Sequence, residues 1–251
     1  MTKLYQAGDG GPMTWVFLSN GGGFDQDIAS RTNILESFYY IADWQTRNMH
    51  RFKSFILDSG AYTFRQNSKK AVDWNDYLRQ YAEYVKEHNV ERIFDLDIDG
   101  IVGYDNMLKL RRSLENIVGR QCTPVWHHSY GKQAWLDLCD EYDYVAIGGI
   151  AGKNNVDITK YLPWFTNEAH KRGTKVHGLG YTRLSDLQRC DFDSVDSTAW
   201  LYGNMAGYVY VWDGRTMQKV SKPNGKKLNS KRVARHNFME WVKMAEDMER
   251  R

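Results

Sequence analysis

The stretch Phe192-Asp193-Ser194-Val195-Asp196-Ser197-Thr198-Ala199-Trp200 is a short apolar run that ends in a carboxylate and a Ser-Thr-Ala turn. On an extended strand, side chains alternate with a period of two, so Asp193 and Asp196 face opposite sides. Asp196 can therefore point into a barrel or cleft, while Asp193 caps or pairs on the outside. If the stretch stood alone, a surface turn rich in Asp and Ser would explain it better.

The rest of the chain repeats this arrangement, because apolar runs that end in Gly, Asp or His alternate with amphipathic segments. We expect strands at 14–19, 54–63, 92–100, 124–128, 144–150, 175–180, around Asp196 and at 208–212. We expect helices at 30–49, 74–88, 104–117, 132–140, 157–171, near 182–189 and from the basic tail to about 248. Seven or eight strands that alternate with helices indicate a parallel α/β protein. The strand count and the chain length favour a (β/α)8 TIM barrel over an open doubly wound sheet, with a C-terminal β-hairpin and helix appended.

Composition narrows the class of protein. The chain has 251 residues, 42% of them hydrophobic and 26% charged, and no low-complexity linker, which predicts one domain over residues 1–251. A net charge of only +3 means that any contact with nucleic acid must come from a local patch. The three cysteines are odd in number and widely spaced, which favours free thiols in a reducing, cytoplasmic compartment. The sequence contains no apolar stretch long enough to predict a membrane span. It also contains no GxGxxG motif or P-loop that would predict a nucleotide cofactor.

In a barrel the active site lies at the carboxyl ends of the strands, so the polar residues there are the candidates. They are Asp58, Asp95, Asp97, Asp99, His127, His128, Gly148, Gly149, His177, Gly178 and Asp196. Carboxylates occur at three of these strand ends, which a merely structural barrel would not need.

The run Asp95, Asp97 and Asp99 allows two functional interpretations. Strand alternation would place the three carboxylates on one face, where they could hold a divalent cation through oxygen ligands. One of them could instead accept hydrogen bonds from a purine's ring N–H and amino groups. Repulsion between the like charges would raise a pKa or require a cation or a donor-rich ligand.

The other candidates also have ordinary explanations. Asp58 could simply form an Asx turn before Gly60, and His177 could be a satisfied core histidine. His127 and His128 are adjacent on a strand, so they face opposite ways and cannot readily bind one metal. At positions 148 and 149 the glycines remove side chains where a flat ring can lie against the backbone.

Five short motifs occur in the order seen in tRNA-guanine transglycosylases. They are Asp58-Ser59-Gly60-Ala61-Tyr62, Phe94-Asp95, Ala146-Ile147-Gly148-Gly149-Ile150, His177-Gly178-Leu179-Gly180 and Phe192-Asp193-Ser194-Val195-Asp196. The sequence resembles that family from about residue 14 to 219, and residues 208–215 resemble the hairpin that follows the family's nucleophile strand.

This resemblance implies a role for each residue. Asp196 would be the nucleophile that forms a covalent glycosyl-enzyme, and Asp58 the general acid/base. The purine would be bound by Asp95 with Asp97, by His127 or His128 in place of a glutamine, by backbone at Gly148 and Gly149, and by His177 with Gly178. No cofactor would be needed, and no metal is expected at the site.

The departures from the family bear on the substrate. The chain lacks the Cys-x-Cys-x-x-Cys…His zinc site of the tRNA enzymes and is well over a hundred residues shorter than expected for one of them. Ala61-Tyr62 stands in place of Gly-Phe, and Ser-Thr-Ala-Trp in place of the Pro-Thr-Arg segment. Compact zinc-less members of this kind resemble phage and bacterial DNA transglycosylases, which exchange guanine for a 7-deazaguanine such as preQ0. We therefore expect DNA as the substrate, flipped or single-stranded, with tRNA as the alternative.

A basic C-terminal segment, 222–236, would contact phosphates. Its cations are Lys222, Lys226, Lys227, Lys231, Arg232 and Arg235. A solvated linker before the last helix would explain the same residues. The sequence leaves open a homodimer and accessory partner proteins. It also leaves two rival functions, a divalent-metal barrel hydrolase or lyase and a nucleic-acid-binding barrel without catalysis.

Overall fold

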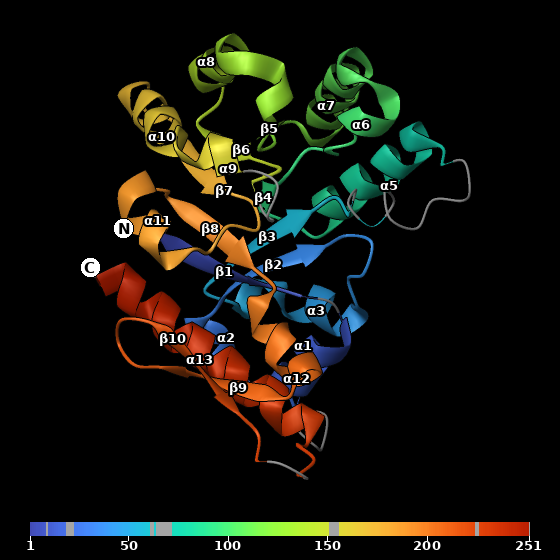
Figure 1. Cartoon of the computed structure of the whole chain (residues 1–251). Coiled ribbons are helices and arrows are strands. Elements are labelled where there is room, and N and C mark those ends of the chain that lie inside the picture. The colour runs from blue at the N-terminus through green and yellow to red at the C-terminus, as the bar shows by residue number, and fades with distance from the viewer. Residues whose placement is uncertain are drawn as a thin grey trace.

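Eight parallel strands form the centre of the molecule (Figure 1). The computed structural model describes residues 1–8, 10–18, 23–60, 63, 72–150, 156–223 and 226–250. The strands follow the order β4-β3-β2-β1-β8-β7-β6-β5 in one sheet. They are β1 (Lys3–Ala7), β2 (Asn33–Ser37), β3 (Ser54–Asp58), β4 (Arg92–Ile93), β5 (Val125–Trp126), β6 (Tyr144–Ile147), β7 (Lys175–Gly178) and β8 (Ser194–Ser197).

The two outer strands of this sheet meet and close it. Just beyond β4, Phe94 forms a parallel bridge with Thr123, which precedes β5. The Thr123 N–H donates to the Ile93 carbonyl at 2.8 Å, and the Asp95 N–H donates to the Thr123 carbonyl at 3.1 Å. The predicted (β/α)8 barrel is therefore confirmed, with its strands in sequence order around the barrel.

Helices cover the outside of the barrel (Figure 1). They are α1 (Gly10–Phe17), α2 (Gln26–Arg31), α3 (Asp43–Asn48), α5 (Trp74–Glu87), α6 (Asp99–Val102), α7 (Tyr104–Val118), α8 (Gly131–Glu141), α9 (Val156–Thr159), α10 (Leu162–Lys171), α11 (Leu184–Cys190), α12 (Tyr202–Ala206) and α13 (Ser230–Arg250). Asp73 caps α5, accepting from the N–H groups of Asn75 and Asp76 at 3.0 and 3.1 Å. The buried stripe of this helix then packs on the barrel.

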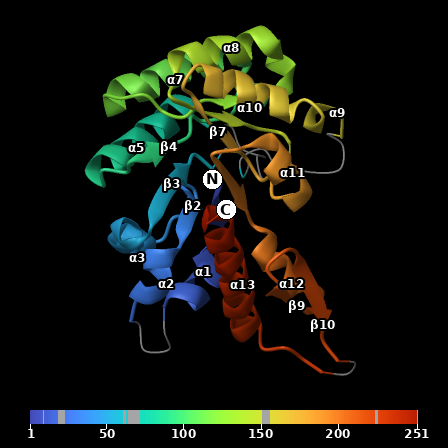
Figure 2. The ribbon, with the colours of Figure 1, turned by 90° about the vertical axis from the view of Figure 1, so that its left-hand side faces the viewer.

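The C-terminal hairpin and helix form one unit beside the barrel. The antiparallel pair β9 (Tyr208–Trp212) and β10 (Met217–Ser221) lies next to α13 (Figure 2). The N–H of Tyr210 donates to Asn237 at 2.8 Å, and the N–H of Trp212 donates to Glu240 at 2.7 Å. Side chains of α13 thus satisfy the outer edge of β9, and α13 also packs on β1 and α1.

Two predicted elements near the N-terminus are wrong. The expected strand 14–19 is mostly helix α1, and the first strand is instead β1. Met13, Val16 and Phe17 are buried at helical spacing, although periodicity cannot separate a short apolar run in a strand from one in a buried helix. The expected helix 30–49 is instead the end of α2, then β2, then α3. Since β2 is covered on both faces, its apolar residues do not alternate.

The inside of the barrel is packed. Its apolar core consists of Tyr5, Ala7, Leu35, Ile56, Phe94, Val125 and Ala146, with Leu179 against it. Polar side chains share this interior, because the Ser54 hydroxyl donates to that of Tyr5 at 3.0 Å, and His177 lies against Phe94 with ring centroids 5.1 Å apart. The barrel is therefore a filled core whose chemistry must lie at its ends.

Candidate active site at the carboxyl ends of the strands

Three polar side chains and a glycine follow or end different strands at the same end of the barrel. Asp58 is the last residue of β3, Asp196 lies near the end of β8, His127 follows β5 and Gly148 follows β6. Because all eight strands are parallel, these carboxyl ends share one face. The segments 61–62, 64–71 and 151–155, which follow two of these strands, lie outside the described residues.

Asp196 is held through one of its oxygens. Its Oδ1 accepts from the Gly180 N–H at 2.7 Å and lies 3.2 Å from His177 Nε2. The residue is 7% exposed, so the carboxylate is nearly enclosed but still reaches the surface. This is the geometry of an oriented carboxylate, because both contacts approach the same atom.

Asp193 directly precedes β8 and pairs away from Asp196, as expected from the sequence. Its Oδ2 accepts from the Val176 N–H at 2.8 Å and lies 2.9 Å from His170 Nε2. Of the two carboxylates in the FDSVDST stretch, Asp196 therefore belongs to the carboxyl-end face. Asp193 instead ties β8 to β7 and α10 near the amino ends of the strands.

Asp58 combines a turn with an unusual electrostatic setting. Its Oδ2 accepts from the Gly60 N–H at 2.9 Å, which is the expected Asx turn. Burial, opposed by this hydrogen bond, and the negative charges of Asp97 and Asp196 raise its pKa to about 7. Three carboxylates from three strand ends thus influence one another, and Asp58 exchanges its proton near neutral pH.

Asp95 does not belong to this group, so its predicted contact with a base is wrong. It is 0% exposed, and its Oδ2 accepts from Arg111 Nε of α7 at 2.8 Å. Burial raises its pKa to about 6, although Arg111 opposes the rise. The side chain points out of the barrel toward the helix layer, because Phe94, its neighbour, fills the interior.

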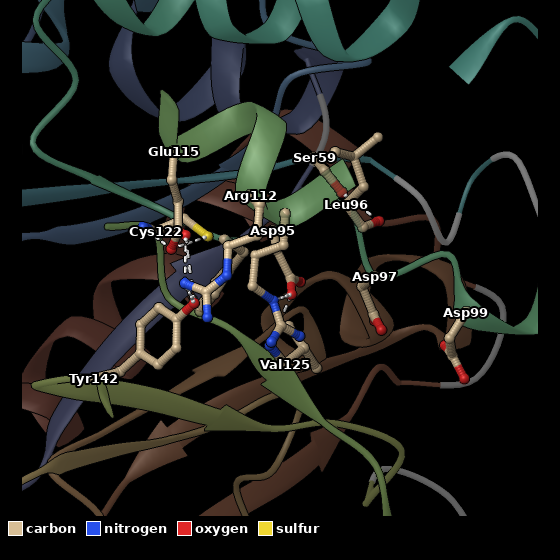
Figure 3. Close-up of polar contacts among 12 residues, drawn as sticks. Ser59, Asp95, Leu96, Asp97, Asp99, Arg112, Glu115, Cys122, Val125 and Tyr142 are labelled. Atoms are coloured by element: carbon tan, nitrogen blue, oxygen red, sulfur yellow. Dashed lines mark hydrogen bonds and ion pairs between the residues drawn. The ribbon is translucent and has the colours of Figure 1, made fainter. Parts of the chain in front are cut away.

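The expectation that Asp95, Asp97 and Asp99 share one strand face is also wrong. The strand ends early, Asp97 takes a left-handed φ of 51°, and Asp99 begins α6. Figure 3 shows Asp97 and Asp99 farther along the chain than Asp95 and away from its polar contacts. A left-handed residue that interrupts the extended backbone, rather than alternation, therefore separates Asp95 from the other two.

His127 joins Asp97 and Asp99. Its Nε2 lies 2.5 Å from Asp97 Oδ1 and 3.9 Å from Asp99 Oδ1. Burial works against a charged ring, but the hydrogen bond to Asp97 and the charges of both carboxylates raise the pKa of His127. Ligand atoms of the three residues lie within 4.8 Å of one another, a spacing that a divalent ion accepts. Tyr130 closes this cluster on one side, hydrogen-bonded to Asp99.

The neighbouring glycines fit the ring of His127. A Cβ at Gly148 would lie 2.7 Å from His127 Cε1, and one at Gly149, where φ is +68°, would lie 3.3 Å from Nδ1. The flat ring that lies against these two glycines is thus the imidazole of His127. A Cβ at Gly178 would instead meet Phe192 and Val195 at 3.2 and 3.3 Å, so this glycine allows close packing between β7 and β8, and its role toward a base stays a prediction.

The remaining histidines are separated. His128 is exposed and stands edge-on to Trp126, apart from the cluster around His127, and its assignment to the base stays a prediction. His177 is 0% exposed inside the barrel. It contacts Asp196 and does not reach the carboxyl-end opening of the barrel, so it does not line the face of a bound base.

The basic segment is largely available to a partner. Five of its six cations are exposed, namely Lys222, Lys226, Lys227, Lys231 and Arg232. Arg235 differs, because it donates to the Val16 carbonyl at 2.8 Å and to Asp25 at 2.6 Å. These contacts tie α13 to the N-terminal helices, and the predicted role of Arg235 toward phosphate stays a prediction.

Sequence reasoning missed Arg111, which neutralises the buried Asp95 away from the site. It also missed two partners within the site, Ser194 and the N–H of Gly180, which complete the surroundings of Asp196. Only the His-Gly-Leu-Gly motif gave a hint of the last of these, since a glycine lets the backbone approach closely.

Comparison with known proteins supports the fold alone. No family model and no curated protein matches the chain. A solved structure, a candidate fructose-1,6-biphosphate aldolase from Coccidioides immitis, matches with a TM-score of 0.57 and 10% identity over 98% of this chain and 88% of that one. The carboxyl transferase domain of Rhizobium etli pyruvate carboxylase, in its Y628A form with pyruvate, matches with a TM-score of 0.46 and 10% identity over 98% and 48%. Among the described residues, no helix is both long and apolar enough to cross a lipid bilayer.

Proposed function

We propose that the protein is an enzyme, a guanine transglycosylase that replaces guanine in DNA with a 7-deazaguanine base such as preQ0. The observation that carries the proposal is the pairing of two carboxylates. Asp196 is oriented through a single oxygen, and its charge helps to raise the pKa of Asp58 to about 7. A fixed nucleophile beside a neutral-pH acid is what a two-step displacement at a sugar carbon requires.

The reaction follows from these roles. A lone pair of Asp196 forms a bond to C1′, the bond from C1′ to the guanine nitrogen breaks, and its electron pair leaves with the base. Protonated Asp58 supplies the proton that the departing guanine takes up. The incoming deazaguanine then attacks C1′, its ring N–H proton passes to Asp58, and Asp196 leaves as a carboxylate. No oxidant, reductant or nucleotide energy is consumed, and the sugar configuration is retained.

Asp97 and His127 are the groups that we assign to the base. Asp97 can accept from the ring N–H and amino group of guanine, while the hydrogen bond to His127 orients it. The ring of His127 is in turn seated against Gly148 and Gly149. Replacing Asp97 by Asn should therefore weaken guanine recognition more than it slows release of a bound base.

The basic segment supplies the contact to DNA in this proposal. Replacing Lys226, Lys227, Lys231 and Arg232 together by Gln should weaken DNA binding and reduce the slope of log affinity against log salt by about one unit for each phosphate that is no longer neutralised. Arg235 stays in place in this variant, because it pairs with Asp25. Unchanged binding and an unchanged slope would assign the segment to a linker.

The test of the function is incorporation of labelled preQ0. Wild-type protein should transfer the label into guanine-containing DNA, whereas Asp196→Ala should transfer none. The matched control is Asp193→Ala, which removes a carboxylate from the opposite end of the same strand and should leave transfer intact. Transfer into tRNA alone would assign the tRNA branch, and no transfer into either nucleic acid would refute the proposal.

A second function, a divalent-metal-dependent hydrolase or lyase, is favoured by one observation, the spacing of Asp97, Asp99 and His127. In that reaction the three residues would hold the ion and Asp58 would handle the proton. The metal-dependent function predicts that EDTA abolishes activity and that a divalent metal restores it. Base exchange that is insensitive to EDTA would exclude it.

A further inference from the structure

A chain of polar side chains runs through the inside of the barrel to Asp196. The hydroxyl of Tyr144 on β6 contacts Ser194 Oγ on β8, and Ser194 Oγ lies 2.5 Å from His177 Nδ1 on β7. The opposite ring nitrogen, His177 Nε2, lies 3.2 Å from Asp196 Oδ1. Three neighbouring strands thus contribute to one connected path.

The chemistry of these four side chains determines which group donates each hydrogen bond. Asp196 as a carboxylate only accepts, so His177 Nε2 carries a hydrogen and donates to it. Burial raises the pKa of Tyr144, which therefore keeps its proton. Among the described residues Ser194 is the one acceptor within hydrogen-bond distance of this hydroxyl, so Tyr144 donates to Ser194. Ser194 then donates its own hydrogen to His177 Nδ1.

If the hydrogen bonds were donated in the opposite direction, a buried donor would be left without an acceptor. If Nδ1 carried a hydrogen, it would donate to Ser194, and the Ser194 hydroxyl would turn toward Tyr144. The Tyr144 hydroxyl would then have no acceptor, although the residue is only 6% exposed. Tyr5 and Phe94 pack around the ring of His177, with centroids 6.1 and 5.1 Å away, and oppose its rotation.

We propose that Tyr144 and Ser194 fix His177 as the neutral tautomer with hydrogen on Nε2, and that this tautomer selects Oδ2 of Asp196 as the attacking atom. His177 Nε2 and the Gly180 N–H both donate to Oδ1. In the described part of the chain Oδ2 has no hydrogen-bond partner, so its lone pair is free to bond to carbon. His177 is thus a positioning residue, and the part of this proposal that concerns attack depends on the function proposed above.

The hydrogen-bond chain predicts a graded set of losses. Ser194→Ala removes the donor to Nδ1 and should slow glycosyl-enzyme formation by about 10- to 100-fold, the usual effect of losing a group that orients a catalytic one. His177→Gln keeps an N–H within reach of Oδ1 and should retain more activity than His177→Leu, which keeps none. His170→Gln, at the other end of the barrel beside Asp193, is the control and should change nothing.

The deciding experiment is nitrogen NMR of the histidine rings in the full-length protein at pH 7.5, with His177→Gln used to assign the His177 signals. We expect the shifts of a neutral ring with hydrogen on Nε2 and none on Nδ1. In Ser194→Ala we expect the Nδ1–H tautomer to become populated while the cooperative unfolding transition is kept. Adduct formation measured on the same samples should fall in its rate constant, with DNA affinity unchanged.

Two results would overturn the inference. Hydrogen on Nδ1 in the wild-type ring would contradict the assigned direction of the chain. Equal activity of Ser194→Ala and wild type would show that the tautomer does not control attack. If the wild-type protein exchanges no base but shows the expected tautomer, the proposed function fails while the assigned hydrogen-bond chain stands.

Discussion

Asp58 should make the fold less stable at neutral and alkaline pH, because its carboxyl must ionise in a buried place and beside Asp97 and Asp196. In the unfolded chain this group ionises near its ordinary pKa of 3.8, and in the folded protein near 7. Between these values the folded protein keeps a proton that the unfolded chain releases. Raising the pH through this window therefore lowers the free energy of unfolding, and the loss is complete above about pH 7.

The size of the effect follows from the two pKa values. The difference of roughly 3 units corresponds to about 4 kcal/mol at pH 8, at about 1.4 kcal/mol per unit. At pH 5 the free energy of unfolding has fallen by only about 1.2 of these units, or about 1.6 kcal/mol. The side chain keeps some solvent contact, which reduces both figures. Asp58→Asn keeps an oxygen for the Gly60 N–H but cannot ionise, so it should gain about 1.5–2.5 kcal/mol relative to wild type between pH 5 and pH 8.

The assay is urea unfolding of both proteins at pH 5 and pH 8. Asp137→Asn on the exposed face of α8 is the control for loss of a charge, and it should stay within about 0.5 kcal/mol of wild type at both pH values. A stability gap between Asp58→Asn and wild type that is the same at pH 5 and pH 8 would refute the raised pKa. It would also remove the argument that Asp58 is an acid poised near neutrality.

Three further results are expected. Gly148→Ala should cost about 1–3 kcal/mol in urea unfolding and lower base exchange at least about tenfold, because its Cβ would displace His127. Arg111→Met should cost about 3–5 kcal/mol at pH 8, since it leaves the Asp95 carboxylate buried without its cation, and less at pH 5, where Asp95 takes up a proton. In pre-steady-state kinetics, guanine release should slow as the pH rises through about 7, whereas attack by the incoming base should become faster, because the first step needs protonated Asp58 and the second needs its carboxylate.

Gly11→Ala is the control for the glycine variant. A Cβ at this position on α1 meets nothing within 4 Å, so both stability and activity should be kept. If Gly148→Ala behaved like this control, the packing of the His127 ring against Gly148 would not matter for base exchange. If Arg111→Met lost equal stability at both pH values, Asp95 would not be titrating. Parallel pH profiles of the two half-reactions would mean that one group does not serve both.

The barrel could be predicted because parallel strands buried on both faces leave a repeated signal at their ends. The strands ending at Asp58 and Ile147 are marked by apolar runs that stop at Asp or just before Gly. The first strand, Lys3–Ala7, carries a weaker mark, because its five residues include a lysine and a glutamine and form no continuous apolar run, although Gly8 follows it directly. Tertiary packing, rather than local pattern, decides such a strand.

The site could be predicted in part for a similar reason. Strand alternation correctly separates Asp193 from Asp196 and His127 from His128, since both pairs lie on or next to regular extended backbone. It fails for the run Asp95, Asp97 and Asp99, because Asp97 is left-handed and the extended backbone stops there, and nothing in the alternating sequence marks that position. Contacts such as Arg111 with Asp95 depend on how α7 packs on the barrel, which periodicity does not specify.

The most direct test of the account is the mass of the protein after reaction with guanine-containing DNA, followed by peptide mapping of any adduct. We predict a covalent protein–DNA species whose mapped attachment is Asp196 and which disappears on addition of preQ0. Asp193→Ala should form it and Asp196→Ala should not. An adduct mapped to another residue, or base exchange without any adduct in the wild-type protein, would contradict the central claim that Asp196 is the nucleophile.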